Sequence, residues 1–260
     1  MIEAHDVGYR INGKDLVAGV SGVFPAGQLH LIVGPNGAGK STLIKILSRL
    51  LVPAAGRVTY DGHDIARDTE RQLAVRRAVL SQAVEIAFSL TVREVVSMGR
   101  YPHFGAHPSS TDEAIVDEVM AFFDVSGMAA RDYLTLSGGE KQRVNFARVF
   151  AQIWRPTPDR TRVLFLDEPL TFLDIGHQLD FMKKVRAVAV DAGMVVVGVL
   201  HDLSLTARLA DCVWLMGGGR LLASGPSADV LTPARVREVF GVEPIVAAVA
   251  GTAGTHLVFQ

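Results

Sequence analysis

The fold is decided by residues 29–41, Leu29-His30-Leu31-Ile32-Val33-Gly34-Pro35-Asn36-Gly37-Ala38-Gly39-Lys40-Ser41. The first five residues form a short apolar run that Gly34-Pro35 stops, as expected of a buried strand. The next eight match the pattern G-x-x-x-x-G-K-[ST], in which glycines let successive backbone N–H groups turn inward around phosphate oxygens. A helix is predicted over Thr42–Leu51, and its N-terminus adds positive potential. The stretch therefore predicts a phosphate-binding strand–loop–helix unit, with Lys40 on the outer phosphates and Ser41 on a magnesium ion.

Two more apolar runs, Val163–Leu166 and Met194–Leu200, lie downstream and are separated by a helical pattern of about twenty residues. This alternation is typical of parallel strands joined by crossover helices. The first run ends in Asp167-Glu168, which places two carboxylates at the edge of the sheet where ligands bind in open α/β folds. Asp167 suits magnesium and Glu168 suits the polarisation of a water molecule. The motif alone also allows helix capping by these acids, so both interpretations stay open at this point.

The segments around this core predict an antiparallel sheet before it and helices within it. Asn12-Gly13 separates Tyr9–Ile11 from Leu16–Val17, a sequence suited to a type I′ hairpin. The remaining predicted elements are helices near Val92–Met98, Asp112–Phe123 and Pro233–Phe240 and a hairpin of Val213–Met216 with Arg220–Ala223. The predicted class is α/β, with a mainly parallel core sheet, an N-terminal antiparallel β subdomain and an inserted α-helical subdomain.

The composition of the chain excludes some classes of function and favours one compartment. The 260 residues include 26 Lys+Arg and 27 Asp+Glu, which argues against a polybasic nucleic-acid binder, and no nucleic-acid partner is predicted. The single cysteine, Cys212, cannot form an internal disulfide, which favours a reducing compartment. Met1–Asp6 carries acids where a signal peptide would carry Lys or Arg. We therefore expect a cytosolic chain.

A second anion-binding segment lies downstream at Leu136-Ser137-Gly138-Gly139-Glu140-Lys141-Gln142-Arg143. Ser137 and Glu140 have the S-x-x-E spacing of a capping box at the start of a helix. A capped helix whose first turn carries two glycines also offers N–H groups and a favourable dipole to a phosphate. Capping and phosphate binding are therefore compatible at this segment.

Taken in order, Gly34–Thr42, Leu136–Gln142, Val163–Glu168 and His201 resemble the motifs of the ATP-binding subunit of ABC transporters. The resemblance runs over essentially the whole chain, and the signature segment, Leu136–Gln142, is highly specific to that superfamily. It implies a P-loop NTPase core and one ATPase domain over residues 1–260, with residues 1–83 and 161–260 as core and residues 84–160 as helical subdomain. It also implies hydrolysis of ATP to ADP and phosphate, with ATP and Mg²⁺ bound.

The resemblance assigns roles to individual positions. Glu168 is expected to be the general base, His201 to contact the γ-phosphate and Gln82 to reach magnesium and the attacking water. The metal ligands implied are Ser41, Gln82 and Asp167, and the ring of Tyr9 is expected to stack on adenine. The nucleotide contacts implied are Tyr9, Gly34, Pro35, Asn36, Gly37, Ala38, Gly39, Lys40, Ser41, Thr42, Ser137, Gly138, Gly139, Glu140 and Asp174.

The resemblance further implies a homodimer that sandwiches two ATP molecules, each between Gly34–Thr42 of one copy and Ser137–Glu140 of the other. The segment Pro169-Leu170-Thr171-Phe172-Leu173-Asp174 departs from the common family pattern Pro-Thr-Ser-Ala-Leu-Asp. Asp174 is kept, so contact between subunits is expected. The bulky Phe172 leaves the hydrogen bonding across the dimer open.

The family receives a membrane permease at about Gln82–Phe104, and Leu90–Phe104 looks like the pattern of importers of iron compounds and cobalamin. Alternatively, Phe88, Met98 and Phe104 fill the core of the helical region. Ala87-Phe88 and Ala151–Arg160 resemble the haem-importing members, whereas Thr171–Gln178 is closer to ferric-siderophore members.

The sequence thus predicts a motor for haem uptake, peripheral on the cytoplasmic side of the bacterial inner membrane. Its expected partners are permease subunits and a periplasmic substrate-binding protein. The alternatives are ferric-siderophore or cobalamin uptake and a soluble ABC ATPase of iron–sulfur cluster assembly.

Overall fold

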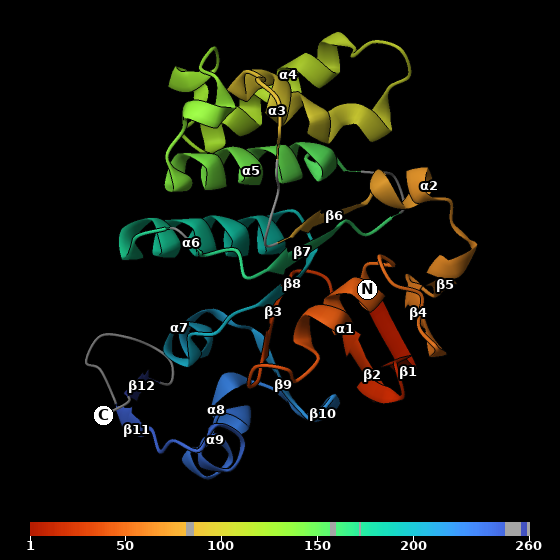
Figure 1. Cartoon of the computed structure of the whole chain (residues 1–260), viewed down its shortest axis with the longest axis vertical. Coiled ribbons are helices and arrows are strands. Elements are labelled where there is room, and N and C mark those ends of the chain that lie inside the picture. The colour runs from red at the N-terminus through yellow and green to blue at the C-terminus, as the bar shows by residue number, and fades with distance from the viewer. Residues whose placement is uncertain (82–85, 157–159, 172, 248–255, 259–260) are drawn as a thin grey trace.

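The computed structural model describes residues 1–81, 86–156, 160–171, 173–247 and 256–258. Within these residues a four-stranded sheet has the order β2-β1-β4-β5 and a six-stranded sheet has the order β10-β9-β3-β8-β7-β6. Figure 1 shows the helices α3, α4 and α5 stacked above α6 and the six-stranded sheet, with α7, α8 and α9 near the opposite end. This arrangement agrees with the predicted fold class.

The four-stranded sheet is built from β1 (Ile2–Ile11), β2 (Lys14–Phe24), β4 (Ala55–Tyr60) and β5 (His63–Asp64), all paired antiparallel. Asn12 and Gly13 join β1 to β2 with φ values of 47° and 78°. Positive φ at both central residues is the requirement of a type I′ turn, which Asn and Gly meet at low cost. The predicted hairpin is confirmed.

The six-stranded sheet carries the parallel strands β3 (Gln28–Val33), β6 (Arg77–Leu80), β7 (Val163–Asp167), β8 (Val195–Val199) and β9 (Cys212–Gly217). Strand β10 (Arg220–Gly225) pairs antiparallel with β9 at one edge. Every residue of β7 and β8 is buried, as expected of central strands covered on both faces. The crossover between these two strands contains α6 (Ile175–Asp191), which confirms the predicted parallel arrangement.

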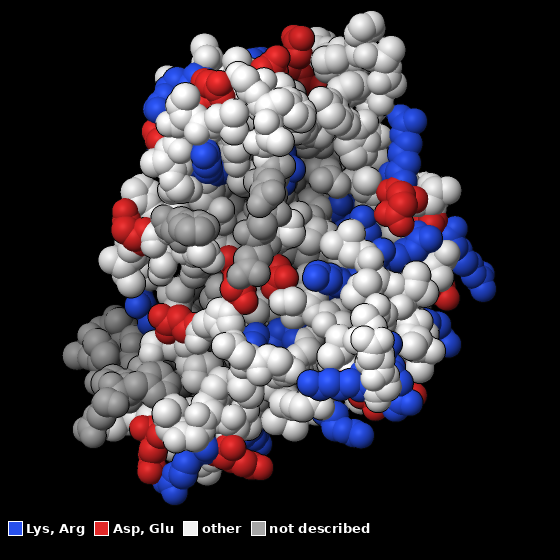
Figure 2. Space-filling model, viewed as in Figure 1, with Lys and Arg blue, Asp and Glu red and all other residues white. Residues whose placement is uncertain are grey.

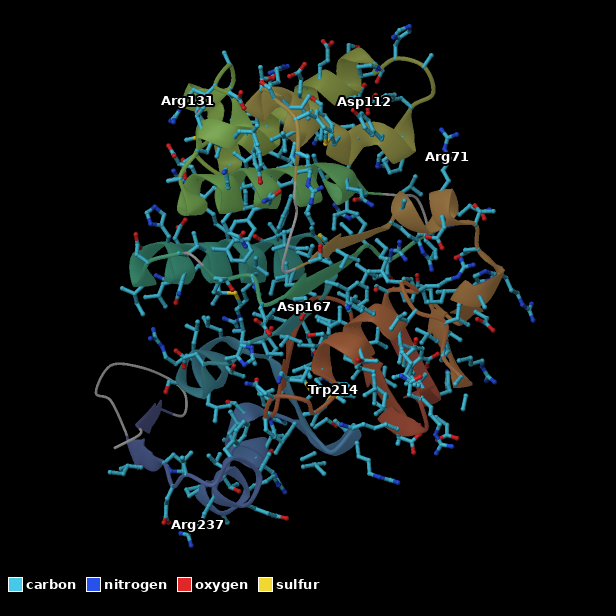
Figure 3. The ribbon with its side chains drawn as sticks, in the orientation of Figure 1. Arg71, Asp112, Arg131, Asp167, Trp214 and Arg237 are labelled. Carbon is cyan, nitrogen blue, oxygen red and sulfur yellow. The ribbon has the colours of Figure 1, made fainter. Side chains whose placement is uncertain are left out.

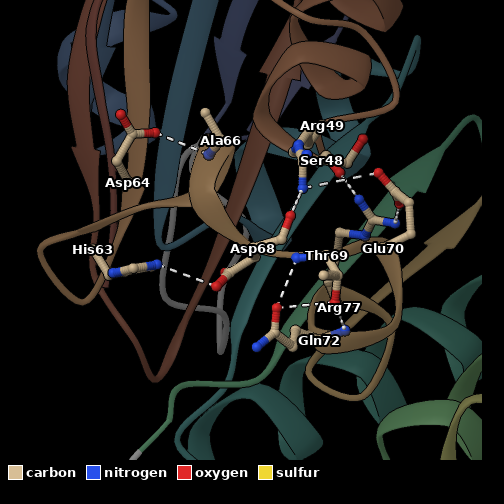
Figure 4. A network of polar contacts seen from close by, with 10 residues as sticks. All are labelled: Ser48, Arg49, His63, Asp64, Ala66, Asp68, Thr69, Glu70, Gln72 and Arg77. Atoms are coloured by element: carbon tan, nitrogen blue, oxygen red, sulfur yellow. Dashed lines mark hydrogen bonds and ion pairs between the residues drawn. The ribbon is translucent and has the colours of Figure 1, made fainter.

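The helix after the phosphate loop differs from its prediction. Helix α1 spans Lys40–Leu47 instead of Thr42–Leu51. It ends early because Arg49 takes a left-handed φ of 57°, and the next residue, Leu50, is 51% exposed. The end of α1 is held by side chains from the next segment, since Arg77 donates to Ser48 O and Arg49 donates to Asp68 O (Figure 4). Polar contacts that are distant in sequence therefore set this helix end.

The helical region follows η1 (Ile65–Arg67) and α2 (Glu70–Ala74). Its elements are α3 (Val92–Ser97), η2 (Met98–His103), α4 (Ser110–Phe122), η3 (Ser126–Met128), η4 (Tyr133–Thr135) and α5 (Gly138–Ile153). The ring of Phe146 on α5 stacks on Phe181 of α6, with centroids 3.6 Å apart. One apolar cluster therefore continues from these helices into the face of the six-stranded sheet.

The C-terminal part contains α7 (Leu203–Leu209), α8 (Ser227–Val230), α9 (Pro233–Phe240), β11 (Ile245–Ala247) and β12 (His256–Val258). The bounds of α9 are those predicted from its pattern. Among the helices that the structure describes, none combines the length and the apolarity that a membrane span requires.

A buried ion pair fixes η2 to α4. Arg100 and Asp112 are each 5% exposed, and Arg100 Nε donates to Asp112 Oδ1 at 2.9 Å. We expect Arg100→Met to lower the free energy of unfolding by about 3–5 kcal/mol, because it leaves the Asp112 carboxylate buried without its cation. Urea denaturation measures the change.

The matched control is Arg93→Met, which breaks the exposed pair of Arg93 with Asp117 and should cost less than about 1 kcal/mol. Equal losses in the two variants would contradict the assignment of a buried charge pair.

Candidate functional site

The phosphate loop, Gly34–Ser41, turns tightly between β3 and α1. Gly34 has a φ of 154°, and a Cβ there would lie 2.2 Å from Met216 O; at Gly39, with a φ of 94°, a Cβ would lie 2.2 Å from Leu16 O. Only glycine fits these two positions, since backbone atoms block a side chain. Gly39 caps α1 without any side-chain hydrogen bond. The first turn of α1 therefore presents its N–H groups and positive dipole end to a ligand.

A cavity of about 210 Å³ opens over this loop. Strands β7 and β8 are adjacent and end beside the phosphate loop. Glu168 and His201, which come just after these two strands, therefore line the cavity. The lining residues are Leu16, Asn36, Gly37, Ala38, Gly39, Lys40, Ser41, Thr42, Glu168 and His201. All but Leu16 are among the predicted site residues, Glu168 as the general base and the others as nucleotide or γ-phosphate contacts. Leu16 was missed because no sequence pattern links a residue of β2 to the phosphate loop.

Lys40 is nearly buried at the floor of the site. Its Nζ donates to Gly34 O at 2.8 Å and to Pro35 O at 3.0 Å. Burial lowers the pKa of the Lys40 ammonium, and the carboxylates of Glu168 and Asp167 oppose that shift. The ammonium thus lies against carbonyl oxygens of the phosphate loop, a position from which it can donate to phosphate oxygens instead.

Ser41 and Asp167 form the oxygen-rich side of the site. Ser41 Oγ donates to Asp167 Oδ1 at 2.8 Å, and Asp167 is 8% exposed. Burial raises the pKa of Asp167, while the Ser41 hydrogen bond lowers it. Figure 3 shows Asp167 near the middle of the molecule, and Figure 2 shows acidic and basic side chains meeting near the middle of the same face.

These two residues fit the preference of magnesium. Mg²⁺ binds hard oxygen ligands and takes one or two carboxylates together with substrate phosphates rather than an all-protein cage. The described residues contain no cluster of three or more His, Cys, Asp or Glu that could hold a metal ion. Gln82, the third predicted ligand, lies outside the described residues.

Glu168 and His201 contact each other across the cavity. His201 Nε2 lies 2.6 Å from Glu168 Oε1, and the imidazole is half exposed. Glu168 has a φ of 53°, a left-handed conformation that is uncommon outside glycine, and Thr171 Oγ1 donates to Glu168 O at 3.2 Å. The backbone turn after β7 therefore directs this carboxylate toward the end of β8.

The signature segment starts α5 with the predicted capping box. Ser137 Oγ accepts from Glu140 N at 3.3 Å, and Ser137 N donates to Glu140 Oε2 at 2.8 Å. A second cavity of about 190 Å³ lies here, lined by Ser137, Gly139, Glu140, Arg143, Leu173, Asp174 and His177. Asp174 caps α6 by accepting from His177 N at 2.9 Å. In the part of the chain that the structure describes, no residue lines both this cavity and the one over the phosphate loop.

The other predicted positions are placed as follows. Tyr9 is half-buried against the apolar cluster around β1 and α1 and lines neither cavity, so its contact with adenine stays a prediction. Gly34 and Pro35 lie in the phosphate loop, and Gly138 lies in the first turn of α5, without lining the cavities. Phe172 lies outside the described residues.

One hydrogen bond between the signature segment and the loop after β7 was not predicted. Gln142 Nε2 donates to Pro169 O at 2.7 Å, which joins α5 to the residue after Glu168. Gln178 Nε2 donates to Leu173 O at 3.0 Å and steadies the same loop. The sequence marked Gln142 as part of the signature segment, but its partner is a backbone carbonyl that no pattern reveals.

Known proteins resemble this chain over most of its length. The family described as ABC transporter matches residues 17–171. The hemin import ATP-binding protein HmuV of Rhizobium meliloti is 43% identical over 242 residues, covering 93% of this chain and 91% of the relative. The protein of the same name from Mesorhizobium japonicum is 45% identical, covering 92% and 91%.

A solved inward-facing structure assigned to the metal-chelate type of ABC transporter superposes with a TM-score of 0.82 at 21% identity. The match covers all of this chain and 96% of that one, and at this identity it shows the fold. Together with the family match, it confirms the resemblance that the motifs indicated. The chain therefore belongs to the ABC transporter family, as an ATP-hydrolysing subunit.

Proposed function

We propose that two copies of this chain form the motor of a haem importer, in which ATP binding joins the copies and hydrolysis releases them. The observation that carries the two-copy arrangement is the separation of the two cavities, because each holds one part of a phosphate-binding site. The haem cargo is supported by the names of the relatives at 43% and 45% identity.

The arrangement follows from what each cavity lacks. Among the residues that the structure describes, the cavity over the phosphate loop is lined by Lys40, Ser41, Glu168 and His201 but by no donor from a second helix N-terminus. The cavity at the signature segment has a capped helix N-terminus, and its described lining includes neither a lysine nor a counterpart of the Ser41–Asp167 pair. Head-to-tail pairing of two copies supplies both to one ATP molecule and assembles the complete site only when ATP is present.

In this site, Lys40 and the N–H groups of the phosphate loop hold the β- and γ-phosphates. Ser41 and Asp167 would hold Mg²⁺, which when bound neutralises part of the phosphate charge. Glu168 accepts a proton from the attacking water as the water oxygen bonds to the γ-phosphorus and the bond to the ADP oxygen breaks. His201 donates a hydrogen bond to the γ-phosphate.

The Glu168–His201 contact implies that the γ-phosphate binds before Glu168 accepts the proton of the water. While the imidazole lies 2.6 Å from Oε1, one oxygen of the Glu168 carboxylate is engaged. An entering γ-phosphate competes for the imidazole N–H, because it carries more negative charge than one carboxylate. Transfer of the His201 hydrogen bond to phosphate would end this contact between the imidazole and Glu168 Oε1.

The surface proposed for the permease lies on the helical region. Phe88 is 62% exposed and Tyr101 is 59% exposed, whereas Met98 and Phe104 are half-buried. Phe88 therefore does not fill the core, which was the alternative reading of its sequence position. Exposed aromatic side chains are typical of protein contact sites. We place the chain at the cytoplasmic side of the inner membrane through this contact, with a periplasmic binding protein delivering the cargo.

Transport by the full complex tests this function. With the chain and its permease reconstituted in vesicles, we expect ATP-dependent accumulation of hemin when hemin-loaded binding protein is supplied. Cobalamin and a ferric siderophore, each supplied with its own binding protein, serve as controls and should not accumulate. Uptake of either control compound without uptake of hemin would assign a different cargo.

A further inference from the structure

The N-terminus of the signature helix is held by a residue outside its motif. Arg131 Nη1 donates to Glu140 Oε1 at 2.9 Å. The other oxygen of that carboxylate, Oε2, accepts from Ser137 N and from Ser137 Oγ, both at 2.8 Å. Glu140 thus links the guanidinium on one side to the Ser137 hydroxyl on the other. Arg131 and Ser137 therefore contact opposite oxygens of one carboxylate.

Arg131 is itself fixed by backbone pairing. Val92 N donates to Arg131 O at 2.9 Å, and Tyr133 N donates to Leu90 O at 2.8 Å, around an antiparallel bridge of Thr91 with Asp132. Ser89 Oγ adds a hydrogen bond to Asp132 Oδ2 at 2.6 Å. The guanidinium therefore extends from a two-segment ladder rather than from a free loop, and Figure 3 shows Arg131 at the edge of the helical region.

The charge of Arg131 matters as much as its position. A carboxylate in the first turn of α5 interacts well with the helix dipole, but it opposes an incoming polyphosphate. The guanidinium beside Glu140 offsets that repulsion. Arg131 is 49% exposed and Glu140 is 23% exposed, so the pair adds little to folding stability. Its presence is better explained by the ligand that the helix end receives.

We propose that Arg131 is a positioning residue for the ATP bound by the other copy, acting through Glu140 on the Ser137 hydroxyl and on the local charge. This inference rests on the proposed two-copy site. Arg131 itself does not touch the nucleotide. It holds Glu140, which in turn orients the Ser137 hydroxyl that does. Lysine keeps the charge but lacks the planar fork, so Arg131→Lys should retain part of the function that Arg131→Ala loses.

Steady-state ATP hydrolysis by the full-length chain tests the inference, together with ATP affinity measured without magnesium. For Arg131→Ala we expect kcat to fall about tenfold or more, while magnesium-free ATP affinity at the intact phosphate loop stays within about twofold. Arg131→Lys should recover at least about a third of the parent kcat. The control Arg155→Ala breaks a comparable exposed pair, with Glu118, away from the signature segment and should match the parent.

A parent-like kcat in Arg131→Ala, no recovery in Arg131→Lys, or a parallel loss of magnesium-free ATP affinity would each overturn the inference. Ser137→Ala separates this failure from failure of the two-copy site. If Ser137→Ala is slow and Arg131→Ala is normal, only the role of Arg131 is wrong. If Ser137→Ala also hydrolyses ATP at the parent rate, the two-copy site itself is wrong.

Discussion

Glu168→Gln is expected to bind ATP and to hydrolyse it about 10²- to 10⁴-fold more slowly than the parent chain. The amide has nearly the shape of the carboxylate, so the cavity keeps its form, but it cannot take the proton of the attacking water. The variant also loses the charge that faces His201 Nε2 at 2.6 Å. Phosphate release measures the rate, and a fluorescent ATP analogue measures binding.

The matched control for this change is Glu113→Gln, an exposed glutamate on α4 that should leave the rate unchanged. Near-normal hydrolysis in Glu168→Gln would show that another group serves as the base. Loss of ATP binding in the same variant would show instead that Glu168 is needed to hold the nucleotide.

Lys40→Ala is expected to weaken ATP binding about 100-fold and to make hydrolysis undetectable. A charge-assisted hydrogen bond contributes about 1.5–3 kcal/mol, and Lys40 is placed to donate to more than one phosphate oxygen. Its present acceptors, Gly34 O and Pro35 O, are backbone atoms of the phosphate loop. Isothermal titration with ATP measures the affinity directly.

The control for the lost charge is Lys183→Ala, an exposed position on α6 that should bind ATP like the parent. ATP affinity of Lys40→Ala within about threefold of the parent would contradict the place given to the ammonium.

Much of the fold was predictable because local sequence patterns determine it. Asn12-Gly13 set a hairpin by backbone preference, and the runs around Val163 and Val195 are too apolar for anything but buried strands. The phosphate loop was predictable for a similar reason. At Gly34 and Gly39 neighbouring backbone atoms leave no room for a side chain, so glycine is required. Short-range chemistry was sufficient for these elements.

The remaining features depend on partners distant in the chain. Helix α1 ends early where Arg77 and Arg49 hold the following turn, and neither residue forms a pattern with α1. Leu16 lines the site because β2 passes the phosphate loop, and the Arg131–Glu140 pair becomes visible only when α5 and the backbone pairing of Arg131 with Val92 are in place. Contacts of this kind are set by tertiary packing, which local sequence does not encode.

We propose that ATP joins two copies of this chain through Ser137, and the mass of the Glu168→Gln variant in solution shows directly whether it does. With ATP and magnesium, light scattering should give twice the 27.9 kDa of one chain, and without ATP it should give the mass of one chain. Adding Ser137→Ala to the same variant should keep it monomeric with ATP bound. A monomer with bound ATP in the single variant, or a dimer that forms regardless of ATP and Ser137, would contradict the account.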